Sequence, residues 1–297
     1  MKQISSIKKT PGERTFDFAN IVILILLGIV TLYPMMYVAF ASISNSNLLM
    51  QHSGFLVRPL GFNLSAYRLV FKNPNIISGF RNSLIILGVG VPLNLVMTAL
   101  GAYFLSRKDV FFKRPITFLI LFTMWFSGGM VPFYLTVYNL NLLNSLASTI
   151  FPFLVGTFNL IIMRTSFAAI PESLEESAKL DGAGHITILF RIVIPLSKAV
   201  IAVMILYYGV EKWNGWFWAS TFITNRSLHP IQVVLRGILI NNDTSLMVVG
   251  MAGADMEEAG ESIKYATTMV ATVPILLIYP FIQKYFVKGV MIGAVKG

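Results

Sequence analysis

Long stretches without a charged residue dominate the pattern of the chain. No Asp, Glu, Lys or Arg occurs at positions 18–57, and a second uncharged run covers 115–163. About 20 apolar residues in a helix, at about 1.5 Å per residue, are enough to cross a bilayer, whereas a charge at its centre costs several kcal/mol. The pattern therefore predicts six membrane spans, at about 19–43, 82–106, 115–138, 144–165, 192–214 and 265–285.

Polar and proline-containing segments mark the boundaries of these spans. The run at 115–163 is too long for one helix, and the asparagines within 139–144 divide it. Pro34 is expected to kink the first helix, and Pro274 and Pro280 to interrupt the last one, because proline lacks an amide proton. We expect an all-α polytopic membrane protein, with a leader at 1–17, a six-helix domain at 18–288 that includes a hairpin at 171–191 and an external loop at 219–264, and a tail at 289–297.

The composition excludes an ordinary soluble domain. Hydrophobic residues make up 56% of the chain and charged residues 12%, with a mean hydropathy of +0.73. The absence of cysteine excludes disulfides and Cys-ligated zinc, and the three histidines have no HExxH spacing, so no metal site is expected. No GxxxxGK(S/T) motif occurs, so the chain cannot itself cradle the phosphates of ATP. We therefore expect a chain that is not an enzyme.

The net charge of +10 is distributed unevenly between the two sides of the predicted membrane domain. Of the 23 Lys and Arg residues, 15 fall in the leader, in the connections that follow the second and fourth spans, and in the tail. Basic residues in short loops stay on the cytoplasmic side. The distribution predicts a multi-pass protein of the bacterial inner membrane, surrounded by lipid, with both termini in the cytoplasm. It also removes the reason to expect nucleic-acid binding.

The connection at 171–191 has the pattern of a helical hairpin. Pro171 suits the first turn of a helix, and three glutamates follow where the positive end of the helix dipole stabilises acids. Gly182 supplies a turn residue, and an amphipathic segment at 183–190 predicts a second short helix. The pattern alone leaves two interpretations open: a hairpin that docks on another protein, or an amphipathic pair that lies on the bilayer surface.

The residues Glu-Ser-Ala-Lys-Leu-Asp-Gly-Ala at 176–183, followed by Ile-Pro-Leu at 194–196, resemble the EAA loop of the permease subunits of ABC importers. In that family the hairpin is a coupling helix that docks in a cleft of the ATP-binding subunit. The resemblance implies that Glu176 pairs with a basic residue of that subunit. Ser177 stands where alanine is usual, and Ala199 where many relatives have proline. The coupling residues implied are Glu175, Glu176, Ser177, Ala178, Asp181, Gly182, Ala183, Ile186, Phe190 and Pro195.

Three further segments resemble the carbohydrate branch of this family. Asp-Gly at 181–182 stands where peptide-type permeases usually carry Leu-Gly, and Glu-Lys-Trp-Asn at 211–214 resembles the Trp-Asn signature of sugar permeases. The end of the chain resembles the tail of maltose-type permeases, whose last residues insert between the two ATPase subunits. The tail residues that this resemblance assigns to the ATPase contact are Gly293, Ala294, Val295, Lys296 and Gly297.

Aromatic and amide side chains in the third to fifth predicted spans are candidates for contacts with a sugar. Sites for sugars combine an aromatic face with groups that hydrogen-bond to hydroxyls. The candidates for the substrate pathway are Trp125, Tyr134, Asn159, Tyr207, Tyr208 and Asn214. Each of them also has a simpler interpretation, as a lipid-belt or helix-packing residue. Trp213, Trp216 and Trp218 are expected at the external membrane interface.

The resemblance implies that the chain is one permease subunit of an ABC importer for carbohydrates, with oligosaccharides expected. Its partners would be a second homologous permease, an extracytoplasmic solute-binding protein and a dimeric cytoplasmic ATP-binding subunit. ATP and Mg would be held by that subunit, and this chain would bind no cofactor. One alternative is a stand-alone, proton-coupled secondary transporter that depends on Glu211 or another buried acid. Another is a structural membrane protein with no transport role.

Overall fold

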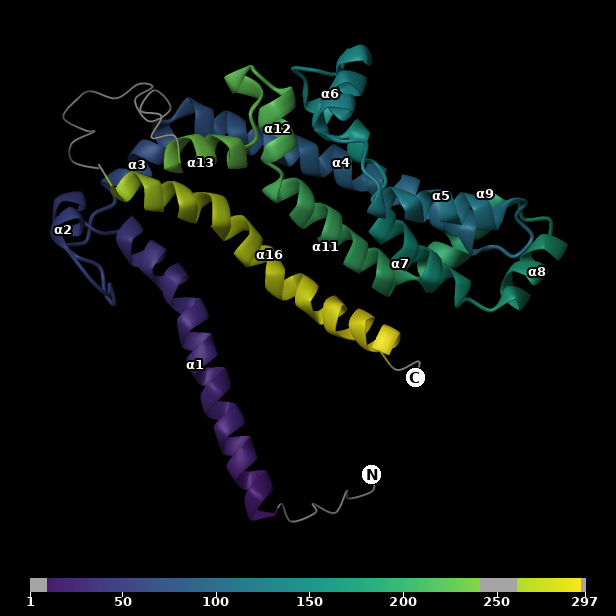
Figure 1. Cartoon of the computed structure of the whole chain (residues 1–297), viewed down its shortest axis with the longest axis horizontal. Coiled ribbons are helices and arrows are strands. Elements are labelled where there is room, and N and C mark those ends of the chain that lie inside the picture. Colours follow the sequence, from purple (N-terminus) through teal and green to yellow (C-terminus); the bar gives the residue numbers. More distant parts are fainter. Residues whose placement is uncertain (1–9, 241–260, 295–297) are drawn as a thin grey trace. The chain divides into compact units, whose positions relative to one another are not determined.

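The computed structural model of the chain describes residues 10–240 and 261–294 (Figure 1). Within these ranges the chain is helical and contains no β-sheet, although an isolated bridge joins Ser44 and Phe62. The helices are α1 Pro11–Ser42, α2 Ser46–Gln51, α3 Ser65–Lys72, α4 Pro74–Ser106, α5 Lys113–Trp125, α6 Met130–Asn139, η1 Leu146–Thr149, η2 Phe151–Phe153, α7 Thr157–Ala168, α8 Glu172–Leu180, α9 His185–Ile188, η3 Leu189–Val193, α10 Ile194–Leu196, α11 Lys198–Asn214, α12 Phe217–Phe222, η4 Arg226–Leu228, α13 Ile231–Leu239 and α16 Ser262–Ala294.

Local sequence signals determine where the two longest apolar helices begin. At the start of α1, the Thr10 hydroxyl accepts from the amide of Glu13 at 3.3 Å, and the Glu13 carboxylate accepts from the amide of Thr10 at 2.7 Å. This reciprocal pair is a capping box. At the start of α4, the side chain of Asn73 accepts from the amide of Asn75, and Pro74 occupies the first helical position.

Two of the described helices, α1 and α4, are long and apolar enough to cross a membrane, and three bent helix pairs raise the number to as many as five. A further apolar segment, Ser262–Leu277 of α16, is shorter. The helix α16 continues through Pro274 and Pro280, so the predicted interruption of the last helix is wrong. Proline within a membrane helix is tolerated because neighbouring groups and small local adjustments satisfy the carbonyl that loses its amide partner.

The spans predicted at 115–138, 144–165 and 192–214 are bent and not straight. The angle is 115° between α5 and α6, 46° between Leu146–Phe153 and α7, and 88° between His185–Leu196 and α11. Gly129, at the first break, has a φ of +88°, which glycine adopts without the steric penalty of a side chain. Pro195 lacks an amide proton immediately before the third break at Ser197.

The chain forms two compact units, of which one contains residues up to Lys72 together with 250–270. In the described part of this unit, Ala41, Leu49 and Leu56 form a small buried core. The hydroxyl of Ser262 donates to the carbonyl of Ser44 at 2.9 Å. The start of α16 is thus held against the segment that follows α1.

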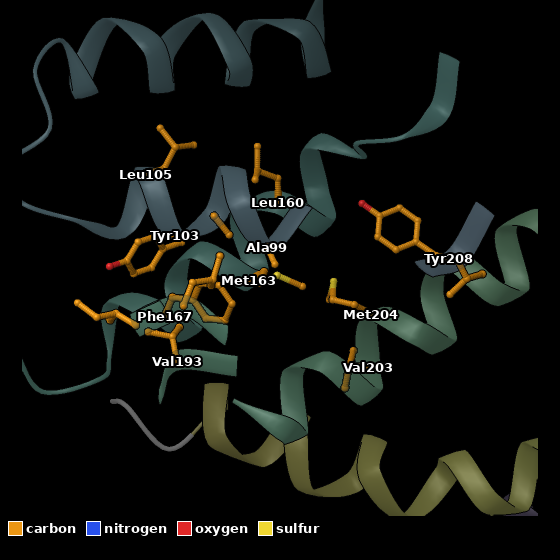
Figure 2. Packing of buried hydrophobic residues seen from close by; sticks show 14 residues of the cluster. Ala99, Tyr103, Leu105, Leu160, Met163, Phe167, Val193, Val203, Met204 and Tyr208 are labelled. Atoms are coloured by element: carbon orange, nitrogen blue, oxygen red, sulfur yellow. The ribbon is translucent and has the colours of Figure 1, made fainter. Parts of the chain in front are cut away.

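The other unit contains residues 73–249 and 271–297, and α4 is its central helix. α4 packs against α7, α11 and α13. Figure 2 shows the core of this unit, in which Tyr103, Met163, Phe167 and Met204 are buried between α4, α7 and α11. Burial of these apolar side chains holds the three helices together, and it positions the segments at their ends where chemistry is possible.

Buried polar side chains fasten other segments to α4. The amide of Asn94 donates to the carbonyls of Phe153 at 2.6 Å and Leu154 at 2.8 Å. Near the other end of α4, the amide of Asn82 donates to the carbonyls of Ser227 and His229 at 2.8 and 3.1 Å. These bonds satisfy backbone groups that lie outside regular helices, which is the condition for placing irregular chain within a membrane protein.

Candidate functional site

The predicted hairpin consists of α8, a turn at Gly182 and the short helix α9. The amides of Gly182 and Ala183 donate to the carbonyls of Lys179 and Ala178 at 3.0 and 2.9 Å, which closes α8. Gly182 has a φ of +79°, so the structure confirms the turn predicted there. The second helix is shorter than the predicted 183–190, because the chain passes into the π-helical turn η3 after His185–Ile188.

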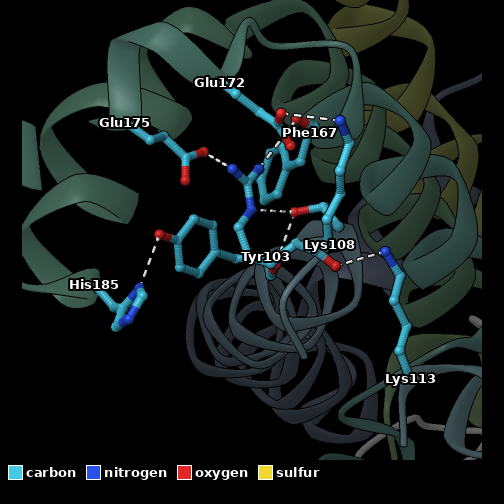
Figure 3. Close-up of polar contacts among 9 residues, drawn as sticks. Tyr103, Lys108, Lys113, Phe167, Glu172, Glu175 and His185 are labelled. Atoms are coloured by element: carbon cyan, nitrogen blue, oxygen red, sulfur yellow. Dashed lines mark hydrogen bonds and ion pairs between the residues drawn. The ribbon is translucent and has the colours of Figure 1, made fainter. Parts of the chain in front are cut away.

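A buried ion pair anchors the hairpin to the end of α4. Figure 3 shows the carboxylate of Glu175, on α8, pointing toward the guanidinium of Arg107, and the two form an ion pair. Glu175 is 4% exposed and Arg107 9% exposed. The guanidinium also donates to the hydroxyl of Ser106 at 3.0 Å and to the carbonyl of Phe167 at 3.3 Å. Ends of α4, α7 and α8 therefore meet at one arginine.

Burial lowers the pKa of the Arg107 guanidinium, but an arginine stays protonated at physiological pH. The charge is therefore permanent, and it lies 4.8 Å above the ring of Tyr103. The Tyr103 hydroxyl is 3.3 Å from Nδ1 of His185, which connects α9 to the same end of α4. At the surface, Lys108 donates to Glu172 at 2.9 Å.

Glu175 faces the permease core and not the surface, which corrects its prediction as a residue that contacts a partner directly. The side chain positions the hairpin. Its partner Arg107 was predicted only as one of four cations in a short connection, and nothing in the sequence distinguishes it from Lys108 or Lys113. A buried arginine can be recognised only when the fold brings a carboxylate to it.

The opposite face of the hairpin is open to solvent in the structure. Ala178 and Ala183 are partly buried, while the exposed predicted coupling residues are Glu176, Ser177, Asp181, Gly182, Ile186, Phe190 and Pro195. Leu180 is 89% exposed, and the sequence prediction missed it. Exposed apolar side chains beside exposed acids are typical of a surface that binds another protein. Of the predicted tail residues, Gly293 and Ala294 belong to α16, and Val295, Lys296 and Gly297 lie outside the described residues.

Tyr208, a predicted lining residue, is buried and saturated by protein partners. Its hydroxyl lies 2.7 Å from the hydroxyl of Thr98 and accepts from the amide of Gly156 at 3.0 Å. The side chain is 1% exposed and connects α4, α7 and α11. The structure thus corrects its role to one of packing. Asn159 is also buried, at 6% exposed.

The other pathway candidates lie in different surroundings. Trp125, at the end of α5, is 89% exposed. Tyr134 packs beside Phe222 with ring centroids 6.1 Å apart, and Tyr207 packs beside Phe158 at 6.3 Å. Asn214 is the one of the six that lines a cavity found among the described residues.

This cavity has a volume of about 270 Å³ and lies where α11 ends. Polar side chains from Thr149, Glu211, Lys212 and Asn214 line it together with aromatic rings. The rings belong to Phe153, Trp216, Phe217 and Trp218. A few polar groups within an aromatic wall are the composition expected of a site for a small molecule.

The three tryptophans near this cavity have separate roles. Trp213 is 5% exposed and donates from Nε1 to the carbonyl of Ala271 at 3.2 Å, so its prediction as an interfacial residue is wrong. Trp216 carries the guanidinium of Arg236 3.6 Å above its ring. Trp218 packs against Phe133 with centroids 4.8 Å apart. Among the residues that the structure describes, no group of His, Asp and Glu could hold a metal ion.

Comparison with known proteins places these features in context. Residues 71–292 match the family described as "Binding-protein-dependent transport system inner membrane component". Protein LplC of Bacillus subtilis (strain 168) is 39% identical over 300 residues, which cover 100% of both chains. The polygalacturonan/rhamnogalacturonan transport system permease protein YtcP of the same organism is 40% identical over 96% of this chain and 99% of its own.

A solved structure has a closely similar fold. It is a chain in the crystal structure of a bacterial ABC transporter involved in the import of the acidic polysaccharide alginate. The similarity covers 95% of this chain and 100% of that one, with a TM-score of 0.85 and 30% sequence identity. The bent spans and the hairpin described above therefore occur in a chain whose overall fold has been observed in a transporter.

Proposed function

This chain belongs to the family of binding-protein-dependent transport system inner membrane components, and from that membership we propose that it is one permease subunit of an ATP-driven ABC importer of carbohydrates. Its fold is that of type I ABC importer permeases. Two of the similar proteins carry polysaccharides in their names or titles. We therefore propose oligosaccharides as the substrate class.

In the proposed complex, this chain forms half of the translocation pathway and a second, homologous permease forms the other half. A dimeric cytoplasmic subunit binds ATP and Mg and supplies the energy, and an extracytoplasmic binding protein delivers the sugar. The uneven distribution of the cations supports a bacterial inner-membrane topology with both termini in the cytoplasm. The last five residues, 293–297, would contact the ATPase.

One observation carries the proposed coupling to the ATPase: the hairpin has an anchored face and a free face. Glu175 binds the inner face to Arg107, while Glu176 and Asp181 are exposed beside Leu180 and Ile186. Acidic and apolar side chains on one exposed surface suit a basic and apolar cleft on a partner. A hairpin held on one side only can dock on a partner and still transmit its movement.

The contacts around Arg107 provide a path for this movement. A shift of α8 acts on α4 through the ion pair and on α7 through the carbonyl of Phe167. A shift of α9 passes through η3 and α10 into α11. Because α4 and α11 pack together and the cavity lies where α11 ends, closure of the ATPase dimer would change the cavity through rigid helices.

The alternative of a proton-coupled transporter is not favoured. It depended on Glu211 or another buried acid, and Glu211 is exposed. The described residue that comes closest to a buried acid is Glu175, which is paired with a permanently charged arginine. A carboxylate held in this way is stabilised in its ionised form and cannot readily take up a proton.

Reconstitution tests the proposed function. The complex of this chain, its partner permease and the ATPase is placed in proteoliposomes with the binding protein inside or outside, and ATP-dependent uptake of oligosaccharides is measured. Glu176→Lys reverses an exposed charge on the free face, so we expect insertion and assembly to be retained and uptake to fall about tenfold or more. Thr224→Lys, which adds the same charge at an exposed position of a distant loop, serves as the control.

The outcome distinguishes the functional classes. Loss of uptake with Glu176→Lys but not with Thr224→Lys supports the docking face. Normal uptake by Glu176→Lys removes the hairpin from the coupling mechanism. Uptake by this chain alone, in the absence of any ATPase, would contradict the proposal and favour a secondary transporter.

A further inference from the structure

Lys212 reaches across α4 at a position where only glycine leaves room for it. A Cβ atom added to Gly90 would lie 2.7 Å from Cε and 2.8 Å from Cδ of Lys212. The ammonium ends 3.5 Å from the carbonyl oxygen of Thr149, at the wall of the 270 Å³ cavity. The lysine side chain is therefore directed along a defined path into the cavity wall and does not extend freely from the end of α11.

The ammonium of Lys212 has bonding capacity that the described chain does not use. The side chain is partly buried, and no carboxylate of the described residues lies within ion-pair distance of it. An ammonium has three donors, and the carbonyl of Thr149 accepts at most one of them, over a long distance. Withdrawing a cation from water without a partner is unfavourable, so an anion entering the cavity would be stabilised there.

The surroundings of Lys212 suit a sugar as the carrier of that anion. Trp216 and Trp218 offer ring faces in the same cavity, and Asn214 offers an amide that can both donate and accept. The carboxylate of Glu211 can accept bonds from hydroxyl groups. The guanidinium of Arg236, which lies over Trp216, adds a second positive charge beside the cavity.

We propose that Lys212 binds a substrate carboxylate in this cavity, so that the importer takes oligosaccharides that contain uronate residues. This inference rests on the proposed function and specifies its substrate class. A carboxylate accepts a charge-assisted hydrogen bond from the ammonium, which is about twice as strong as a bond between neutral groups. A neutral sugar of the same shape would leave the lysine without a counter-charge. The volume is close to the lower limit of about 300 Å³ for small-molecule sites, which suits a subsite for a terminal part of a longer chain.

The test compares an acidic substrate with its neutral form. Uptake of trigalacturonate and of its fully methyl-esterified form is measured with the reconstituted complex and its binding protein. Lys212→Met keeps the length of the side chain and removes the charge. We expect it to lower uptake of trigalacturonate about tenfold or more while uptake of the ester stays within about twofold of the wild type. Lys212→Arg should restore most of the preference for the acid.

A second pair of variants leaves the lysine in place. Gly90→Ala puts a methyl group into the path of the flexible end of Lys212, so the ammonium is displaced while the backbone of α4 is retained. We expect the same selective loss of trigalacturonate uptake. Gly88→Ala is the matched control, because a Cβ at that position meets nothing within 4 Å. Since the binding protein is the same in every sample, a change in the acid-to-ester ratio comes from the permease.

The failures can be told apart. An equal effect of Lys212→Met on both substrates, or no effect on either, overturns the carboxylate site and leaves the importer function intact. A wild-type complex that imports neutral oligosaccharides but not trigalacturonate has the same meaning. A wild-type complex that imports no carbohydrate with ATP overturns the proposed function itself, and the inference with it.

Discussion

Arg107 and Glu175 form a buried ion pair that joins the end of α4 to the hairpin helix α8. Desolvation of two charges is costly, so such a pair contributes little net stability compared with apolar residues of similar shape. Its specific value here is geometric, because the planar guanidinium also bonds Ser106 and the backbone of Phe167. The pair fixes the orientation in which the hairpin presents its other face.

Removal of one partner should therefore be more damaging than removal of both. We expect Arg107→Met to lower the free energy of unfolding by about 3–5 kcal/mol, because it leaves the carboxylate of Glu175 buried and unpaired. The double variant Arg107→Met/Glu175→Met should recover much of that loss. Thermal unfolding of the purified complex in detergent measures the effect.

The exposed pair of Lys108 and Glu172 is the natural comparison. Its side chains are 81% and 52% exposed, and Lys108→Met should change stability by about 1 kcal/mol or less. Equal losses from Lys108→Met and Arg107→Met would show that burial of the second pair has no energetic consequence. A double variant less stable than Arg107→Met alone would contradict the unpaired-charge explanation.

Gly182 should be more sensitive to alanine than its neighbour Gly184. Gly182 has a φ of +79°, and a residue with a Cβ is strained there by about 1–3 kcal/mol. We expect Gly182→Ala to distort the turn and to reduce ATP-dependent uptake while the protein remains inserted. Stimulation of the ATPase by the permease, measured in the same proteoliposomes, reports whether the hairpin still docks.

Gly184 is a close control, since its φ is −75° and an added Cβ meets nothing within 4 Å. Gly184→Ala should retain uptake. If both variants were equally impaired, the left-handed conformation of Gly182 would not be the cause.

The hydroxyl of Tyr208 should contribute to stability and not to sugar contact. Tyr208→Phe leaves the amide of Gly156 without an acceptor and the hydroxyl of Thr98 without a partner in a buried position. Unsatisfied buried groups cost about 1–3 kcal/mol, so the melting temperature of the complex should fall. Affinity for the transported sugar, measured as KM, should stay unchanged.

Tyr207→Phe provides the comparison on the same helix, because Tyr207 is only partly buried and packs through its ring. It should have little effect on stability. A large rise in KM with Tyr208→Phe, without loss of stability, would restore Tyr208 to the substrate pathway.

Gly79 is expected to determine how closely α13 approaches α4. A Cβ at Gly79 would lie 3.1 Å from Cα and 3.3 Å from the amide nitrogen of Ile231, so the backbone of α13 would have to move. Alanine is favoured over glycine within a helix by about 1 kcal/mol, but overpacking costs about 1–3 kcal/mol. We expect Gly79→Ala to be destabilising on balance. An unfolding curve at or above that of the wild type would show that the loop before α13 gives way at no cost.

The predicted spans correspond to helices because hydrophobic length is a local property. Uncharged stretches of sufficient length identified α1 and α4 correctly, and the turn at Gly182 was predicted from one residue type. Bending was not predictable in the same way. Pro274 and Pro280 suggested an interruption that α16 does not have, while the 115° bend between α5 and α6 occurs where the sequence suggested a single span.

Predictions for individual site residues divided according to what each side chain meets. Glu176 and Asp181 are exposed on the hairpin as the pattern suggested, but the neighbouring Glu175 is buried against Arg107. Tyr207 and Tyr208 are adjacent in sequence and equal in type, yet only Tyr208 finds hydroxyl and amide partners across two other helices. Neither distinction is present in the local pattern.

The sequence by itself determined the class of the protein, the approximate positions of its apolar helices and the hairpin, because hydrophobicity, charge and turn residues act within short segments. Only the tertiary structure decided that Arg107 anchors the hairpin, that Tyr208 is a packing residue and that Lys212 lies along Gly90 at a cavity. Each of these results depends on contact between residues far apart in the chain. Such contacts arise only when helix packing brings the two surfaces together, so no single segment contains the information.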